Sequence, residues 1–284
     1  MKNTYRIGHI ALQLSYVYDD FFASRIAPFQ KDVMPDYFME VLIESTLARP
    51  TLPVTMTYRD KTIYEAKDMH YIVKTNASEE VTHLISYTPD YRKITIQLAS
   101  NIGERLPEVE YLLTGMMFFE MAIRTQMIPF HASAISYLDE AILFSAPSQT
   151  GKSTQADLWQ KNLSEVQFIN DDKPVIFLDH DVLHVSGTPW SGKTPRTNAL
   201  VKPVKCILFL EQAYKNELIP LSNQDKLTHF FRNIHRPREE ELIDEVLKSL
   251  ELMIREVPIY LFQCRKDQDA FEYLYHALYR GDHL

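Results

Sequence analysis

The segment that most constrains this chain of 284 residues is APSQTGKS, at positions 146–153. It matches the pattern G-x-x-x-x-G-K-[ST] at every defined position except the first, where alanine replaces glycine. The apolar run 140–145 before it is typical of a short buried strand, and residues 152–160 after it are typical of a helix start. In that frame, backbone N–H groups can surround a phosphate chain. The sequence therefore predicts that the chain binds a nucleoside triphosphate.

The polar groups of this loop have separate expected roles. Lys152 is expected to reach the β- and γ-phosphates, and the Ser153 hydroxyl to bind Mg²⁺. Ala146 fits the first position only with a negative φ, because a Cβ makes positive φ costly. The residues expected to contact ATP are Ala146, Ser148, Gln149, Thr150, Gly151, Lys152, Ser153 and Thr154.

Composition narrows the class of protein. Hydrophobic residues make up 45% of the chain and charged residues 24%, which is typical of a soluble globular protein. A formal net charge of −8 disfavours nonspecific nucleic-acid binding, which needs clustered Lys and Arg. No apolar run approaches the about 18–20 residues that span a bilayer, and the N-terminus does not resemble a signal peptide. We therefore expect a cytoplasmic protein that binds neither nucleic acid nor membrane, with Cys206 and Cys264 as buried structural thiols.

The first region, residues 1–104, is expected to be β-rich and to act as a lid or a substrate-docking module. Residues 38–46 are expected to form a short helix in it. Alternating and β-branched patterns predict its strands at 5–14, 51–58, 61–65, 70–75 and 93–99.

The second region, residues 105–284, is expected to be the catalytic domain. It opens with a helix from Pro107 that is apolar on most sides and therefore expected to be buried. From Pro129 onward, short apolar runs alternate with helical patterns, which predicts an α/β core with several antiparallel strand pairs. The runs 132–136 and 141–145 are expected to pair around a turn at 137–140. Helices are also expected at 152–162, 221–234, 239–255 and 268–279.

Two adjacent carboxylates, Asp171 and Asp172, follow the apolar run 166–169 and therefore lie at the expected end of a strand. Phosphoryl transfer needs a carboxylate for the metal and often a base for the attacking hydroxyl. A solvated turn is the alternative, because Asp-Asp-Lys-Pro is good turn chemistry. The phosphate loop upstream favours the functional interpretation, in which Ser153, Asp171 and Asp172 bind Mg²⁺ and one of the two carboxylates, by a small margin Asp171, is the base.

Two further segments carry candidate residues. His131 precedes the expected strand pair and is a candidate catalytic residue, although a lone histidine is more often structural. The segment 187–193 has two glycines, two hydroxyls and a lysine, and such a loop can hold a phosphate or a substrate through its N–H groups, or be an ordinary turn. Asn198 follows this loop as a further candidate. The residues expected to contact the substrate are Ser191, Gly192, Lys193 and Arg196.

Taken in order, these segments resemble the HPr serine kinase family and its relatives, which share a catalytic core with ATP-type phosphoenolpyruvate carboxykinase. The carboxykinase pattern M-H-C-S-A-N, then G-x-S-G-T-G-K-T, then D-D is similar to residues 130–135, 146–153 and the pair Asp171-Asp172. The resemblance covers roughly residues 129–210. It implies a mixed-sheet core with a P-loop, in which Lys152 binds phosphate and His131 lies near the transferred phosphate or a second metal.

The chain also departs from this family. It is much shorter than a carboxykinase, and residues 187–193 stand where HPr kinases carry a glycine-rich E-I-R-G-like motif. The chain is more similar to the relatives that accompany peptide-modifying gene clusters. The resemblance thus implies an ATP- and Mg²⁺-dependent kinase that acts on a hydroxyl, most simply a serine of a peptide or small protein. A small-molecule kinase and a non-catalytic ATP-binding sensor stay open, as does a homo-oligomer, because related kinases are often oligomeric.

Overall fold

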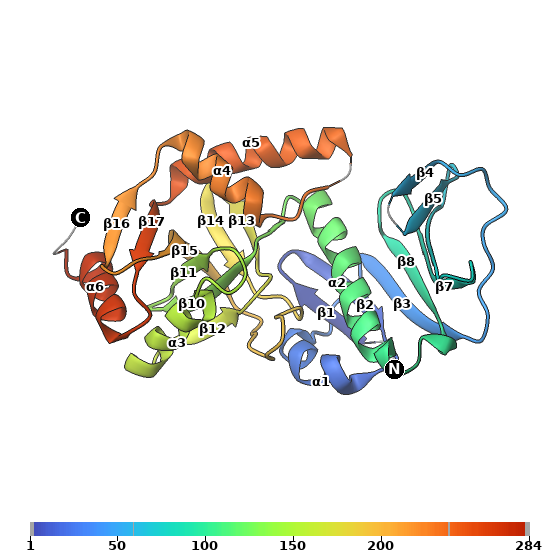
Figure 1. Ribbon diagram of the computed structural model, residues 1–284, viewed down its shortest axis with the longest axis horizontal. Coiled ribbons are helices and arrows are strands. Elements are labelled where there is room, and N and C mark those ends of the chain that lie inside the picture. The colour runs from blue at the N-terminus through green and yellow to red at the C-terminus, as the bar shows by residue number, and fades with distance from the viewer. Residues whose placement is uncertain (1–2, 59, 238, 282–284) are drawn as a thin grey trace. The chain divides into compact units, whose positions relative to one another are not determined.

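The computed structural model describes residues 3–58, 60–237 and 239–281 of the chain. The chain divides into two compact units, Met1–Thr125 and Gln126–Leu284. Figure 1 labels their elements in chain order. No helix in the described part of the chain is both long enough and apolar enough to cross a membrane.

The first unit is built on an eight-stranded sheet with the order β1-β2-β3-β8-β7-β6-β5-β4. Strand β3 pairs in parallel with both β2 and β8, and the other neighbours are antiparallel. The strands are β1 Asn3–Ile7, β2 Ile10–Ser15, β3 Tyr37–Glu44, β4 Met56–Tyr58, β5 Lys61–Glu65, β6 His70–Thr75, β7 Val81–Tyr87 and β8 Lys93–Ala99.

The prediction of a helix at residues 38–46 is wrong, because these residues lie in and just after β3. Within β3, buried Met39 and Val41 alternate with exposed Phe38, Glu40 and Leu42. A period of two residues suits a strand with one covered face. Pairing on both sides, which the local sequence does not reveal, then decides against a helix. The strand expected at 51–58 is reduced to β4, Met56–Tyr58.

Two helices complete the first unit, α1 Asp19–Ile26 and α2 Leu106–Arg124, with short 3₁₀ turns at Ala27–Phe29 and Ser100–Arg105. Pro107 stands in the first turn of α2, where its missing N–H costs nothing. As expected, most of α2 is buried, and it packs on α1 and β8. These contacts make α2 part of the first unit, whereas the sequence grouped residues 105–124 with the second region.

The second unit is a mixed α/β structure built on a nine-stranded sheet, with the path β12-β10-β11-β15-β14-β13-β9, and with β17 and β16 joined beside β15. Strand β15 pairs in parallel with β11 and β17, and the other pairs are antiparallel. The strands are β9 Ile128–Pro129, β10 Ala132–Tyr137, β11 Glu140–Ser145, β12 Gln167–Asn170, β13 Val175–Asp179, β14 Val182–Ser186, β15 Val201–Gln212, β16 Glu217–Pro220 and β17 Ile259–Cys264.

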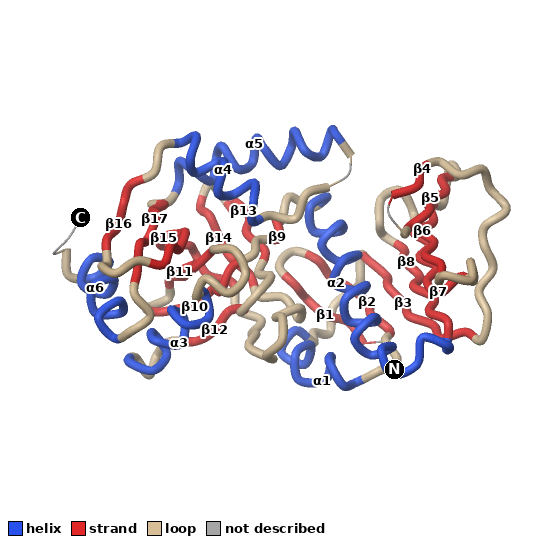
Figure 2. Tube along the Cα trace, in the orientation of Figure 1, coloured by secondary structure: helices blue, strands red, loops and turns tan. Residues whose placement is uncertain are grey.

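Helices lie on both faces of this sheet, α3 and α6 on one and α4 and α5 on the other (Figure 2). Neighbouring residues of β15 serve opposite faces, because Leu208 packs in the cluster with Trp159 of α3 and Phe271 of α6, while Phe209 packs edge-to-face on Phe230 of α4. Both cysteines are buried, as expected. The expected helices are confirmed as α3 Lys152–Asn162, α4 Asn223–Asn233, α5 Glu240–Glu256 and α6 Gln268–Tyr279.

The register of β10 determines which polar residues can meet. Ala132 of β10 lies opposite Ser145 of β11, which confirms the expected hairpin, and Ala134 lies opposite Asn170 of β12. The start of β10, the end of β11 and the end of β12 therefore share one edge of the sheet. Residues that leave these three strand ends are brought together there.

Candidate functional site

The loop between β11 and α3 begins at this edge. Its left-handed residues are Gln149, with φ 67°, and Gly151, with φ 121°, so the positive φ values do not fall on Ala146. A side chain at Gly151 would be strained, which explains a glycine there. Gln212 at the end of β15 braces the loop, because its Nε2 donates to the carbonyl oxygens of Thr150 at 3.0 Å and Gln149 at 3.4 Å. The loop ends where α3 begins, at Lys152.

Asn170 holds the turn that carries the two carboxylates. Its side chain is fully buried, and its Oδ1 accepts the N–H groups of Asp172 at 2.8 Å and Lys173 at 2.7 Å. Its Nδ2 donates to the carbonyl oxygen of Thr188 at 2.8 Å. An Asn side chain that accepts from N–H groups two and three residues further along stabilises a turn. Asn170 therefore fixes where Asp171 and Asp172 leave β12 and ties them to the segment that begins after β14.

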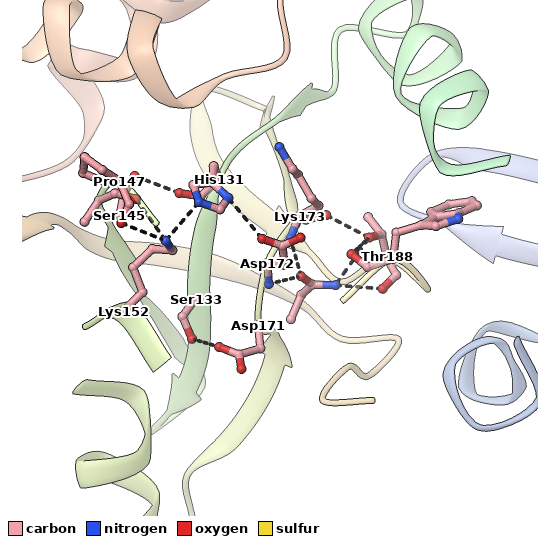
Figure 3. Close-up of polar contacts among 12 residues, drawn as sticks. His131, Ser133, Ser145, Pro147, Lys152, Asp171, Asp172, Lys173 and Thr188 are labelled. Carbon is pink, nitrogen blue, oxygen red and sulfur yellow. Dashed lines mark hydrogen bonds and ion pairs between the residues drawn. The ribbon is translucent and has the colours of Figure 1, made fainter. Parts of the chain in front are cut away.

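Three side chains form a polar chain across the edge (Figure 3). Lys152 Nζ lies 3.0 Å from His131 Nε2 and donates to the carbonyl oxygen of Ala146 at 3.0 Å and to that of Pro147 at 3.5 Å. Because an ammonium group can only donate, His131 Nε2 accepts and the ring proton lies on Nδ1. That Nδ1 is 3.1 Å from Asp172 Oδ1. Burial lowers the pKa of Lys152, while the charges of Asp172 and Asp171 oppose this shift.

Asp171 and Asp172 are neighbours in unlike surroundings. The side chain of Asp171 is 6% exposed and that of Asp172 is 32% exposed. Ser133 Oγ donates to Asp171 Oδ1 at 2.6 Å. Burial raises the pKa of Asp171, while the hydroxyls of Ser133 and Ser153 and the charge of Arg196 oppose this rise. Two adjacent carboxylates in different environments are suited to different tasks.

Arg196 approaches the site from the segment after β14. Its guanidinium forms an ion pair with Asp157 of α3, lies over the ring of Phe168 at 5.0 Å, and has Nη1 4.0 Å from Asp171 Oδ2. Thr194 Oγ1 lies 3.4 Å from the same Asp171 oxygen. A cation is thereby held beside the buried carboxylate.

A cavity of about 620 Å³ collects these groups. It brings together most residues expected from the sequence and adds three that were missed, Asp157, Thr194 and Lys266. The expected residues that line it are His131, Ser148, Gln149, Gly151, Lys152, Ser153, Thr154, Asp171, Asp172, Ser191, Gly192, Lys193 and Arg196.

Some residues expected to contact ATP or the substrate do not offer their side chains to the cavity. Ala146 is buried and contributes its carbonyl oxygen to Lys152, and Thr150 is not part of the lining. Ser191 Oγ donates to the carbonyl oxygen of Thr194 at 2.8 Å, so its hydroxyl shapes its own loop. Asn198 Nδ2 donates to the carbonyl oxygen of Phe168 at 2.8 Å, which is a structural role beside β12.

Of the missed residues, Asp157 left a signal in the sequence. It follows Ser153 by four residues, and this spacing places both on one face of α3. Lys266 follows β17, more than a hundred residues after the loop, and only the fold brings it near. Among the described residues, no three His, Cys, Asp or Glu side chains are placed to hold a metal ion together. The expected metal ligands are two carboxylates and the hydroxyl of Ser153.

Comparisons with known proteins find a likeness among solved structures. No protein-family model matches the chain. None of the curated proteins compared with it matches either. Among solved structures, the HPr(Ser) kinase/phosphatase from Coxiella burnetii matches 54% of this chain and 94% of its own, with 16% sequence identity and a TM-score of 0.32. A likeness this weak carries no functional argument, so the function must be inferred from the site.

Proposed function

We propose that the chain is an ATP- and Mg²⁺-dependent phosphotransferase that acts on a hydroxyl group, with a serine of a peptide or small protein as its acceptor. One observation carries the proposal. A helix N-terminus with Lys152 and Ser153 shares a cavity of about 620 Å³ with two carboxylates, of which Asp171 is buried and Asp172 is not. Phosphoryl transfer depends on this combination, because it consists mainly of positioning and charge stabilisation.

The residues fit a magnesium nucleotide. The N–H groups at the start of α3 and the side chains of Lys152, Lys193, Arg196 and Lys266 surround the cavity with positive charge, which suits a polyphosphate. The Ser153 hydroxyl and the Asp172 carboxylate are hard oxygen ligands, and Mg²⁺ commonly binds through one or two such groups plus substrate phosphates. When bound, Mg²⁺ would neutralise charge on the phosphates.

Each side chain then has a task. Lys152 is held by the carbonyl oxygens of Ala146 and Pro147 and by His131, and it would exchange part of this contact for a phosphate oxygen. Arg196, oriented by Asp157, would face the transferred group. His131 would keep Lys152 and Asp172 at a fixed separation, since it contacts both.

Asp171 is assigned the role of base for the acceptor hydroxyl. Its burial raises its pKa, which makes the carboxylate a better proton acceptor, while Ser133 keeps one oxygen oriented. Its Oδ2 is on the side of Thr194 and Arg196. In a loose transition state the proton leaves late, so a carboxylate is a sufficient base. Asp172, which is more exposed, is assigned to the metal.

The test is to incubate the purified protein with ATP, Mg²⁺ and candidate serine peptides, and to follow ADP and phosphopeptide by mass spectrometry. Lys152→Ala should lose both ATP affinity and transfer. Lys161→Ala, at the exposed far end of α3, is the matched control and should retain both.

The other outcomes separate the alternatives. Transfer to a small-molecule hydroxyl alone would make the protein a small-molecule kinase. Mg²⁺-dependent ATP binding without transfer would make it a sensor. ATP binding that Lys152→Ala leaves intact would overturn the site itself. A homo-oligomer stays a prediction from the sequence resemblance.

A further inference from the structure

The second unit has another cavity, of about 450 Å³, lined by residues of α4, β11, β15 and β17 and by the start of the loop after β11. Its walls include Pro147, Phe209 and Leu261. Such a volume, with apolar walls and a few polar groups, is typical of a site for a small molecule. His131 lines this cavity as well as the cavity of about 620 Å³.

Two opposite charges border this second cavity, Arg232 of α4 and Glu211 of β15. Within the part of the chain that the structure describes, no ion pair joins them. Glu211 Oε2 accepts a hydrogen bond from Gln263 at 2.7 Å, which leaves its other oxygen for a ligand. His229 stacks on Phe209 with ring centroids 4.7 Å apart. Burial and the charge of Arg232 lower the pKa of His229, so this ring adds no second cation at neutral pH.

We propose that this cavity binds a free α-amino acid with an apolar side chain. The carboxylate of the ligand would face Arg232, whose planar guanidinium can form two parallel hydrogen bonds to it. The ammonium group would face Glu211, and the side chain would lie among Pro147, Phe209 and Leu261. A ligand that is both zwitterionic and apolar satisfies all three features, whereas an amine or a carboxylate alone leaves one charge without a partner.

The position of the cavity links its ligand to the candidate active site. The end of α4 is joined to the segment that carries His131, because the His131 N–H donates to the Asn233 carbonyl oxygen at 2.7 Å and the His235 N–H donates to that of Pro129 at 3.0 Å. The carbonyl oxygens of Ala146 and Pro147, on the same wall, contact Lys152. An amino acid and ATP would therefore alter each other's affinity, and by thermodynamic linkage the factor is the same in both directions. Binding itself does not depend on phosphotransfer.

The probe is 4-fluoro-L-phenylalanine, observed by fluorine NMR on the full chain without nucleotide. Two analogues carry one charge each, 4-fluorophenethylamine, which lacks the carboxylate, and 3-(4-fluorophenyl)propionate, which lacks the amine. We expect a Kd of about 1 mM or below for the amino acid, as is usual for a ligand of this size. Each analogue should bind about tenfold more weakly, because it loses one charge-assisted contact.

Substitutions then assign the charges. Arg232→Gln should lower the affinity for the amino acid about tenfold and leave the affinity for the amine analogue unchanged. Glu211→Gln should also lower the affinity for the amino acid about tenfold, and it should leave the affinity for the propionate analogue unchanged. Lys226→Gln, on α4 but outside the cavity lining, is the control and should change nothing. Circular dichroism of each variant checks the fold.

Equal binding of the amino acid and both analogues would overturn the proposal. So would amino-acid binding that Arg232→Gln leaves unchanged. If Mg²⁺-ATP abolishes binding of the amino acid and Arg232→Gln has no effect on it, the ligand belongs to the cavity of about 620 Å³. That result would also contradict the proposal. Because none of these measurements uses transfer activity, failure here is distinct from failure of the proposed kinase function.

Discussion

Among the described residues, burial raises the pKa of a carboxyl group in each unit, Glu110 in the first and Asp171 in the second. Glu110 of α2 is fully buried and accepts the backbone N–H groups of Val17 at 2.6 Å and Tyr18 at 2.9 Å, just before α1. Asp171 accepts from the hydroxyl of Ser133 and borders a cavity. Backbone donors cannot turn away without moving the chain, whereas hydroxyl groups rotate. A buried carboxylate is therefore structural or functional according to its donors and its access to a cavity.

Replacing Asp171 tests this comparison most strongly. Asp171→Asn retains the size of the side chain and an oxygen for Ser133, but it removes the proton acceptor. We expect turnover to fall about 1000-fold, within the usual range for loss of a general base. Thermal unfolding should change little. Turnover within tenfold of the unchanged protein would remove Asp171 from the chemistry and leave the two carboxylates equivalent.

Replacing Glu110 tests whether this carboxylate serves stability and not turnover. Glu110→Ala leaves the N–H groups of Val17 and Tyr18 without their acceptor, which should lower the free energy of unfolding of the first unit by about 2 kcal/mol. Urea denaturation measures this change, and turnover per folded molecule should be unaffected. Glu108→Ala, at an exposed position in the first turn of α2, is the control and should cost less than about 1 kcal/mol. A loss of turnover without loss of stability would contradict the assignment.

Replacing Asp157 tests whether this carboxylate contributes to activity by orienting Arg196. Asp157→Asn removes the ion pair with Arg196, so the guanidinium loses its fixed direction beside Asp171. We expect a rise of about tenfold in KM or a similar fall in kcat, as for the loss of one charge-assisted hydrogen bond. Asp181→Asn, in an exposed turn outside the cavity lining, should have no effect. An unchanged Asp157→Asn enzyme would mean that Arg196 needs no orienting partner.

Sequence patterns predict the features that depend on nearby residues better than the contacts between distant segments. The loop before Lys152, the β10–β11 hairpin and most helices follow from local patterns, because each is decided by residues a few positions apart. Spacing on α3 places Asp157 beside Ser153, but its ion pair with Arg196 depends on pairing between distant segments. The same is true of the positions of Ser133 and Lys266. Ser133 meets Asp171 across 38 residues, and only the register of β10 against β12 shows it. Glu110 was part of a recognisable helix, but its partners lie 92 and 93 residues away.

Replacing Ser133 should have the smallest effect on activity. It tests which of the two carboxylates, Asp171 or Asp172, is the base. The hydroxyl of Ser133 lowers the pKa of Asp171 against the effect of burial, so Ser133→Ala should raise that pKa further. A base must be ionised to act, and activity increases with pH as Asp171 loses its proton. The acid limb of kcat/KM should therefore move to higher pH, with loss of activity at low pH and recovery at higher pH.

The same shift has a consequence for stability. Because the pKa of Asp171 in the folded state lies above its ordinary value of 3.8, its contribution to the unfolding free energy falls as pH rises through the raised pKa. Asp171→Asn should abolish this dependence. Ser133→Thr, which keeps the hydroxyl, should leave the acid limb in place, and Ser136→Ala, on the same strand, is the control. An acid limb that stays fixed in Ser133→Ala would transfer the proton-accepting role to Asp172, whose carboxylate is half-buried. The comparison with Glu110 would then no longer identify the base.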